Sequence, residues 1–175
     1  GMAGVPATRV ESACASGGVA LRSAFIDVAS GVSDLVLAAG VEKMTDSTEV
    51  TDVLATASDQ ELEAYHGITF PGLYAMIARA HMEAHGPTEE DLAWVAVKNH
   101  RHGALNPKAQ FPRVVDVETV MNSSIVSEPL RLLHCSPVSD GGAAVLLCPL
   151  DQAKKYTDRP VKILGSGLAI RFLGL

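Results

Sequence analysis

The sequence predicts an α/β protein in which a mainly helical segment interrupts a sheet. Two apolar runs of strand length, residues 35–41 and 143–148, lie far apart in the chain. Unbroken apolar runs of this length are typical of strands that are covered on both faces. Between them the composition becomes polar from Thr45 onward and then shows helical spacing. We therefore expect one sheet with an insertion rather than two equal halves.

The N-terminal part of the chain is expected to form a β-α-β unit. Residues 5–10 are expected to be extended, and the apolar spacing over residues 15–30 predicts a helix. This helix has only two charged side chains, so we expect it to be nearly surrounded by protein. Strand 35–41 follows, which would place Cys14 at the carboxyl end of the first strand, where open α/β sheets bind ligands.

The insertion begins with a polar excursion and continues with two helices. Residues 45–62 show no sustained period and are expected to be exposed. Helical spacing follows over residues 70–85, and Gly86 ends it. A second helix begins after Thr88, with Asp91 in the position of a capping-box carboxylate, and continues to about residue 99.

The last third of the chain predicts a short helix and then a return to the sheet. Residues 117–121 favour the helix, and the Ser-Pro-Val-Ser-Asp-Gly-Gly segment, residues 136–142, favours a tight turn. The apolar strand 143–148 follows this turn. We expect a short helix over residues 150–156 and one more strand over residues 161–168.

Composition excludes several classes of partner. The chain has 175 residues, 47% of them hydrophobic and 19% charged, which is typical of a packed domain with one sizeable core. A net charge of −6 argues against a general binder of phosphate backbones, so we expect no nucleic-acid partner. The apolar runs are far shorter than a bilayer span, so we expect no membrane-spanning helix.

The cysteines indicate a reducing compartment. Cys14, Cys135 and Cys148 show no regular spacing, and no leader with a basic and then an apolar region precedes them. A disulfide framework is therefore not expected, and a cytoplasmic location is.

Cys14 is the candidate catalytic residue. It lies among small residues in the stretch 11–18, where a helix is expected to begin. The unpaired N–H groups and the dipole at a helix start favour a thiolate over a thiol, and Gly17 and Gly18 leave room for a ligand. The alternative is that Cys14 is a small buried hydrophobic residue, as most free cysteines are. The local sequence leaves both interpretations open.

The histidines do not predict a metal site. His81 and His85 share one helix face and His100 lies close to His102, but no Cys-x-x-Cys or His-Glu-x-x-His pattern supplies further ligands. We expect no metal, and we expect His134 to be a packing residue.

The turn that contains Ser136 is a second candidate for ligand binding. Hydroxyls and free N–H groups between secondary-structure elements can line the path of an anionic ligand. An ordinary turn that connects two elements explains the same residues, and the residues alone favour that explanation.

Three segments taken together resemble the thiolase family. They are residues 11–18, 40–44 and 136–144, and both their order and their separations agree with the family. The likeness is closest to the archaeal and sterol-carrier-protein-type branch, which segments 67–72 and 99–111 also resemble. It covers nearly the whole chain.

This resemblance implies a partial thiolase fold, part of a β-α-β-α-β layer with an inserted, mainly helical loop domain. Residues 1–44 would be a partial N-terminal half, residues 45–133 the loop domain that helps to hold coenzyme A, and residues 134–175 the return to the sheet and the start of the second half. Cys14 would be the acylated nucleophile, and Ser136 would lie beside the pantetheine. The family implies acyl-CoA or coenzyme A as substrate, no permanently bound cofactor, and a homo-oligomer.

The chain also departs from the family. It contains neither the Gly-His-Pro motif, whose histidine activates the nucleophile, nor the Cys-x-Gly motif of the second catalytic cysteine. The resemblance therefore implies a central fragment of a thiolase-type acyltransferase, incomplete as an autonomous catalyst. Two alternatives stay open: a non-catalytic module that binds coenzyme A or a partner, and a subunit that is stable only in an assembly because its strand edges are exposed.

Overall fold

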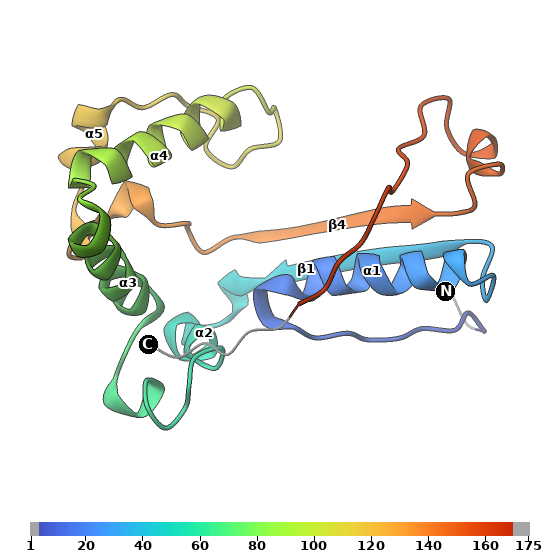
Figure 1. Ribbon diagram of the computed structural model, residues 1–175, viewed down its shortest axis with the longest axis horizontal. Coiled ribbons are helices and arrows are strands. Elements are labelled where there is room, and N and C mark those ends of the chain that lie inside the picture. Colours follow the sequence, from blue (N-terminus) through green and yellow to red (C-terminus); the bar gives the residue numbers. More distant parts are fainter. Residues whose placement is uncertain (1–3, 170–175) are drawn as a thin grey trace. The chain divides into compact units, whose positions relative to one another are not determined.

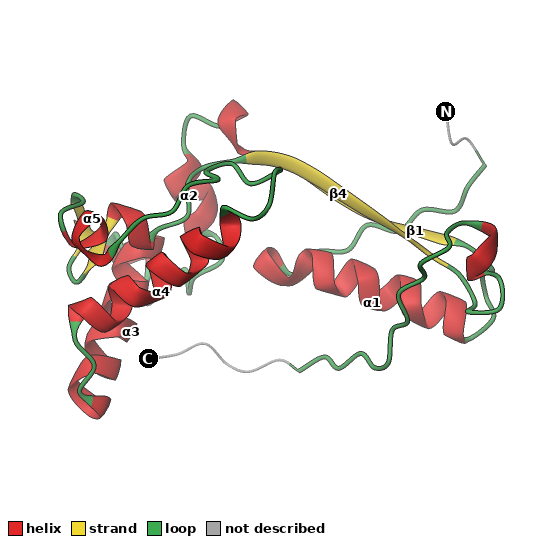
Figure 2. Ribbon diagram, turned by 90° about the horizontal axis from the view of Figure 1, so that it is seen from above, coloured by secondary structure: helices red, strands yellow, loops and turns green. Residues whose placement is uncertain are grey.

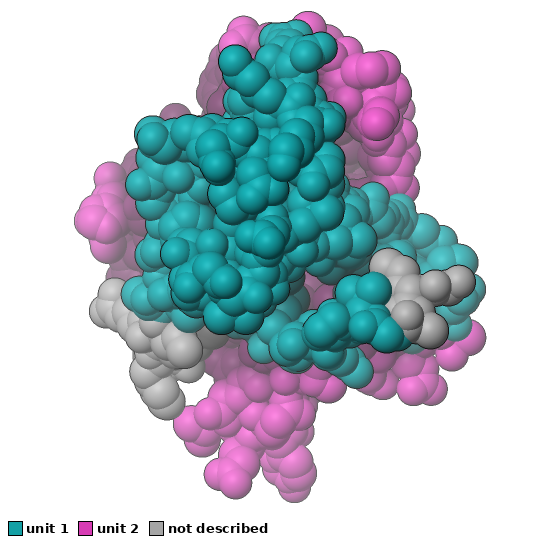
Figure 3. Space-filling model, turned by 90° about the vertical axis from the view of Figure 1, so that its right-hand side faces the viewer, with its two compact units in different colours: residues 1–47, 139–175 teal, residues 48–138 magenta. Residues whose placement is uncertain are grey.

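The computed structural model describes residues 4–169, which divide into two compact units. The first unit contains the segments Gly1–Ser47 and Ser139–Leu175, and the second unit is the continuous segment Thr48–Val138. Figure 3 colours the two units separately. The second unit is thus inserted, in sequence, into the first.

The first unit is a two-stranded antiparallel ribbon with one long helix. A 3-10 turn, η1 (Ala13–Ala15), leads into helix α1 (Ser16–Ala29), and strand β1 (Val36–Lys43) pairs with strand β4 (Asp140–Leu147). In Figures 1 and 2, α1 runs alongside this ribbon, and it packs mainly against β1. The helix expected over residues 15–30 and the strands expected at 35–41 and 143–148 are confirmed within a few residues.

The expected β-α-β unit is wrong. Residues 6–12 form no strand, and the neighbour of β1 is β4, which runs antiparallel to it. The expected turn over residues 136–142 is also partly wrong, because β4 already begins at Asp140. A Cβ atom built at Gly142 would lie 3.5 Å from the carbonyl oxygen of Gly40, an ordinary van der Waals distance, and this glycine lies in the paired strands rather than in a turn.

The expected burial of α1 and β1 is wrong as well. Ala24 is the buried residue of α1, whereas Leu37 and Val41 of β1 are 53% and 81% exposed. The physical reason is the layer arrangement of the unit. One helix on a two-stranded ribbon covers one face of each element, whereas a strand in a parallel sheet is covered on both faces.

The segment after β4 is less regular than expected. A single 3-10 turn, η5 (Ala153–Lys155), replaces the helix expected over residues 150–156. Residues 161–168, expected to be a strand, have no regular structure. A strand forms only where a neighbour completes its hydrogen-bond ladder, and an apolar sequence alone does not supply that neighbour.

The second unit is mainly helical. Its 3-10 turns are η3 (Ala64–His66) and η4 (Leu132–His134), and a small hairpin joins strands β2 (Ile125–Ser127) and β3 (Leu130–Arg131). Its helices are α2 (Val50–Ala55), α3 (Phe70–His85), α4 (Glu89–Gly103) and α5 (Val117–Met121). Helix α2 lies within the excursion that was expected to be irregular, while α3 and α5 have the predicted bounds.

The helix termini explain these bounds. Gly86 ends α3 in the left-handed conformation at φ +80°, which a residue without a side chain adopts readily. Thr88 and Asp91 form the predicted capping box, each side chain bonding the other residue's backbone N–H. Helix α4 ends four residues later than expected, and the Arg101 cation in its last turn interacts favourably with the helix dipole.

The core of the second unit is small and lies between α4 and α5. It contains Ala93, Ala96, Val115 and Val120, with Leu133 packed against it. None of the helices in residues 4–169 has the length and hydropathy needed to cross a bilayer.

Candidate active site

Cys14 lies in the 3-10 turn directly before α1, and its side chain is exposed. The residue before it, Ala13, has a φ of +46°. This left-handed conformation costs an L-residue other than glycine roughly 1–2 kcal/mol. Strain of this kind persists only where neighbouring interactions hold it, and it is most frequent at functional sites.

A local network of hydrogen bonds holds this turn. The carboxylate of Glu11 accepts the N–H of Ala13 and the hydroxyl of Ser16, both at 2.8 Å. The Ser16 oxygen in turn accepts the N–H of Ser12 at 2.8 Å. The Ser16 hydroxyl bond and then the Ala13 N–H bond hold the pKa of Glu11 below its ordinary value. The sequence alone did not predict that Glu11 and Ser16 hold the turn around Cys14. The only sequence signal for this role is that two polar side chains flank the cysteine within five residues.

Two of the family-like segments are the two strands of one ladder. Gly40 pairs with Ala143, Val41 with Gly142, and Lys43 with Asp140. The segments that carry the family resemblance are far apart in sequence, and the antiparallel register of β1 and β4 places them side by side.

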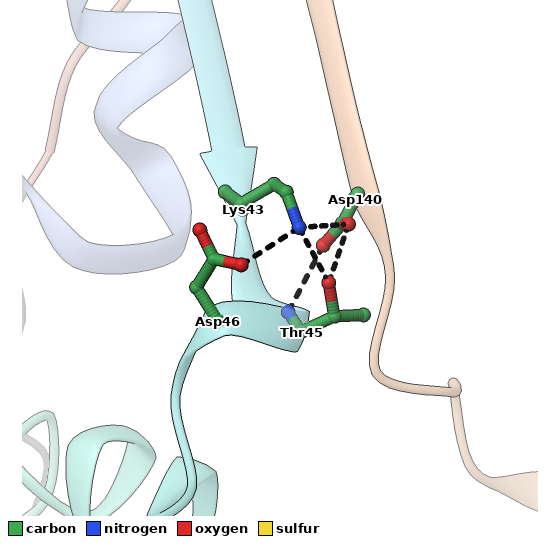
Figure 4. Close-up of polar contacts among 4 residues, drawn as sticks. All are labelled: Lys43, Thr45, Asp46 and Asp140. Carbon is green, nitrogen blue, oxygen red and sulfur yellow. Dashed lines mark hydrogen bonds and ion pairs between the residues drawn. The ribbon is translucent and has the colours of Figure 1, made fainter.

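A polar cluster closes the end of this ladder (Figure 4). The Nζ atom of Lys43 lies 3.0 Å from Asp140 Oδ2, 2.9 Å from Asp46 Oδ1 and 2.8 Å from Thr45 Oγ1. Thr45 also donates to both carboxylate oxygens of Asp140, its backbone N–H at 3.0 Å and its hydroxyl at 2.6 Å. The cluster thereby ties the residues after β1 to the first residue of β4.

The hydrogen bonds of this cluster shift two pKa values in opposite directions. The bonds from Thr45 and then the Lys43 ammonium lower the pKa of Asp140, while Asp46 and then Asp140 raise the pKa of Lys43. Both shifts favour the charged forms, so the cluster is a structural ion pair rather than a proton-transfer pair.

Ser136, the second candidate, lies in the second unit beside a cavity of about 540 Å³. The cavity is lined by residues of α4, by Phe111, by Leu130 and by residues 133–137. Two half-buried residues, His134 and Cys135, precede the exposed Ser136 in this lining. Burial lowers the pKa of His134 and raises that of Cys135, which keeps both groups neutral near pH 7.

His134 also has a structural role, as a packing residue would. Its Nδ1 atom accepts the backbone N–H of Arg131 at 2.9 Å, so the hydrogen of the neutral ring lies on Nε2. Cys14 belongs to the first unit and Ser136 to the second, so the structure gives the surroundings of each residue separately.

The histidine pairs do not form a metal site within residues 4–169, where no group of three His, Cys, Asp or Glu side chains could hold an ion. The rings of His81 and His85 lie 4.7 Å apart on α3. The cysteines 14, 135 and 148 are all free.

Comparison with known protein families gives the class of the protein. Residues 1–151 match the family described as Thiolase, N-terminal domain. Because this match covers most of the chain, the protein belongs to the thiolase family. Together with the mixture of helices and strands, the match confirms the expected partial α/β thiolase fold.

Individual relatives show which members of the thiolase family this chain resembles. An acetyl-CoA acetyltransferase of Methanothermobacter thermautotrophicus is 60% identical over 169 residues, which cover 97% of this chain and 44% of that protein. Sterol carrier protein 2 of Homo sapiens is 35% identical over 167 residues, covering 89% of this chain and 30% of that protein. These similarities confirm the expected branch of the family.

A solved structure is also similar to this chain over part of its length. The "Ltp2-ChsH2(DUF35) aldolase" is similar with a TM-score of 0.64 and 31% sequence identity, over 80% of this chain and 36% of that one. The chain therefore spans less than half the length of each protein to which it is compared.

Neutralising Asp140 should remove an acid-sensitive part of the stability. A carboxyl group whose folded pKa lies below its ordinary value of 3.8 stabilises the fold above that pH, and this contribution disappears as the pH falls through the folded pKa. We expect the urea midpoint of the unaltered chain to fall between about pH 4 and pH 2 by more than that of Asp140→Asn. The control is Glu42→Gln, which removes an exposed carboxylate of the same ladder, and parallel curves for Asp140→Asn and the unaltered chain would contradict the prediction.

Proposed function

We propose that the chain carries the nucleophile of a thiolase-type acyltransferase, which transfers acyl groups between coenzyme A thioesters. The observation that carries this proposal is an exposed Cys14 presented by a strained turn at the start of α1, in a chain of the thiolase family. Its relative from Methanothermobacter thermautotrophicus is named an acetyl-CoA acetyltransferase. The reaction class follows from this relationship and from the chemistry of the thiol.

A cysteine suits this reaction because one thioester is exchanged for another. The Cys14 thiolate attacks the thioester carbonyl, the carbon–sulfur bond to coenzyme A breaks, and coenzyme A leaves as a thiolate that takes up a proton. The bond that forms and the bond that breaks are both thioester carbon–sulfur bonds, so the acyl group moves with little change in free energy. No permanently bound cofactor is needed for these steps.

Turnover by this chain alone should be slow. The sequence contains neither the Gly-His-Pro nor the Cys-x-Gly motif whose side chains take up protons in the family. Loss of the base that activates a nucleophile lowers turnover by several orders of magnitude, although a single acylation can still be observed.

The second unit is proposed to act as the loop domain that helps to hold coenzyme A. The expected bounds are 1–44 for the N-terminal half, 45–133 for the loop domain and 134–175 for the return to the sheet, and they differ by a few residues from those of the second unit, Thr48–Val138. Ser136 is the proposed contact to the pantetheine. Its position at the cavity of the second unit supports this assignment.

Acylation of Cys14 tests the nucleophile directly. After incubation with acetyl-CoA, we expect peptide mass spectrometry to find an acetyl group on Cys14, formed more slowly than on a full-length relative. Cys14→Ser should abolish this adduct, while Cys135 and Cys148 serve as internal references because they are only half-exposed. An unmodified Cys14, under conditions that acylate the relative, would contradict the proposal.

A second candidate function is a non-catalytic module that binds coenzyme A or a partner. The cavity of about 540 Å³ favours it, because apolar residues, the neutral His134 and the Ser136 hydroxyl are all in its lining. Apolar cavities of this size with a few polar groups are typical of small-molecule sites.

Calorimetric titration with coenzyme A tests this second function. We expect saturable heat from the unaltered chain and a weaker affinity, by about 5- to 10-fold, for Ser136→Ala, because one hydrogen bond contributes about 1 kcal/mol. Ser47→Ala in the first unit is the matched control. The absence of saturable heat would contradict the binding module.

The chain is further proposed to act in a homo-oligomer in a reducing compartment such as the cytoplasm. Exposed apolar side chains on β1 and the three free cysteines support these assignments. We expect light scattering to give a mass above that of one chain, and a monodisperse monomer would contradict the homo-oligomer.

A further inference from the structure

The backbone at Ala13 needs an explanation that the fold does not supply. An alanine at φ +46° is less stable in this conformation than in an extended one, by a factor of about 5 to 30. No glycine occupies the position, although glycine would adopt the conformation without strain. Some interaction must therefore hold Ala13 in place.

The interactions that hold Ala13 come from the Glu11 side chain and from the backbone and hydroxyl of Ser16, on either side of Cys14. The N–H of Ala13 donates to the Glu11 carboxylate at 2.8 Å. The carbonyl of Ala13 accepts the backbone N–H of Ser16. The one hydroxyl hydrogen of Ser16 can be donated either to this carbonyl at 2.7 Å or to the Glu11 carboxylate at 2.8 Å. The φ and ψ angles of Ala13 together set the relation between these two peptide groups, so bonds to both groups restrict both angles.

Glu11 and Ser16 are also bonded to one another, and neither caps α1. The Ser16 hydroxyl lies 2.8 Å from the Glu11 carboxylate, and its oxygen accepts the N–H of Ser12. Helix α1 begins without a side-chain cap, since its N-cap residue is Ala15. The network therefore serves the turn around Cys14 rather than the helix.

We propose that Glu11 and Ser16 are positioning residues for the Cys14 nucleophile, which hold Ala13 in the left-handed conformation that presents the thiol. Neither side chain needs to touch a substrate to do this. The inference rests on the proposed function for its catalytic meaning, while the geometry it describes can be tested with a reagent other than acyl-CoA.

The test uses two measurements on the full chain. The first is the intraresidue nuclear Overhauser effect between HN and Hα of Ala13, which is strong only when φ is positive. The second is the rate of alkylation of Cys14 by iodoacetamide, read for each cysteine by peptide mass spectrometry. A residue that contributes only to global stability would not change the backbone angle of Ala13 in chains that remain folded.

Four variants give distinct expectations. Glu11→Ala should lose the Ala13 signal and slow alkylation of Cys14 by about 5- to 30-fold, the factor by which extended backbone is preferred. Glu11→Gln keeps an oxygen acceptor and should stay within about twofold of the unaltered chain. Ser16→Ala should fall between these two, because the bond from Ala13 to Glu11 remains. Glu11→Ala combined with Ala13→Gly should recover alkylation, because glycine adopts positive φ without the network.

The matched control is Glu42→Ala, which removes an exposed carboxylate from β1 in the same unit and should leave both measurements unchanged. The inference would be overturned if Glu11→Ala kept the Ala13 signal and the Cys14 rate. It would equally be overturned if Ala13→Gly failed to rescue the rate, or if Glu42→Ala slowed it to the same extent.

Acetyl-CoA separates this inference from the proposed function. If both hold, the variants should rank for acetylation of Cys14 as they rank for alkylation. If acetyl-CoA leaves the unaltered chain unmodified while the two measurements follow the expected order, the proposed function fails and the positioning role stands.

Discussion

The first unit depends on the antiparallel ladder between β1 and β4. Its eight residue pairs run from Val36 and Leu147 to Lys43 and Asp140. The bonds between Thr45 and Asp140 close a loop of 95 residues, so this ladder forms at a large cost in chain entropy. The polar cluster at its end adds ionic and hydrogen-bonded contacts where the second unit departs and returns, and α1 has a surface to pack against only when the ladder is formed.

Two kinds of interaction position Cys14: the pairing of strands that are far apart in sequence, and hydrogen bonds between residues that are close in sequence. The ladder supports α1, and α1 begins directly after the turn that contains the cysteine. The turn itself is held within a span of six residues, from Glu11 to Ser16. The pairing of β1 with β4 therefore supports the helix that follows Cys14, and local hydrogen bonds set the conformation of the turn that contains the thiol. This division resembles a common arrangement in enzymes, in which a rigid scaffold carries a strained functional residue.

Sequence reasoning was successful where the signals are local. Helices α3 and α5 have their predicted bounds, because Gly86 and the side chain of Asp116 mark termini through interactions over three or four residues. It failed where the partner of a segment decides its structure. Residues 161–168 have the composition of a strand, but they pair with no other strand within residues 4–169. Residues 140–142 have the composition of a turn, but they pair with β1 as part of strand β4. Cys14 is a candidate because its neighbours are small, and its role stays a prediction. Glu11 was not a candidate, because a carboxylate that bonds a residue two positions away leaves no periodic pattern.

The geometry of Cys14 depends on residues close to it in sequence, whereas the reactivity of a thiol depends on groups that are close to it in space. Every hydrogen bond that fixes Ala13 comes from residues 11–16, so a chain less than half as long as its relatives still contains the full set. Groups that take up the proton of a nucleophile or stabilise an oxyanion must instead approach the sulfur through space. The motifs that carry the family's two bases do not occur in this sequence. The geometry of the thiol is therefore encoded locally, whereas the groups that activate a thiol can come from any part of a protein that lies near the sulfur.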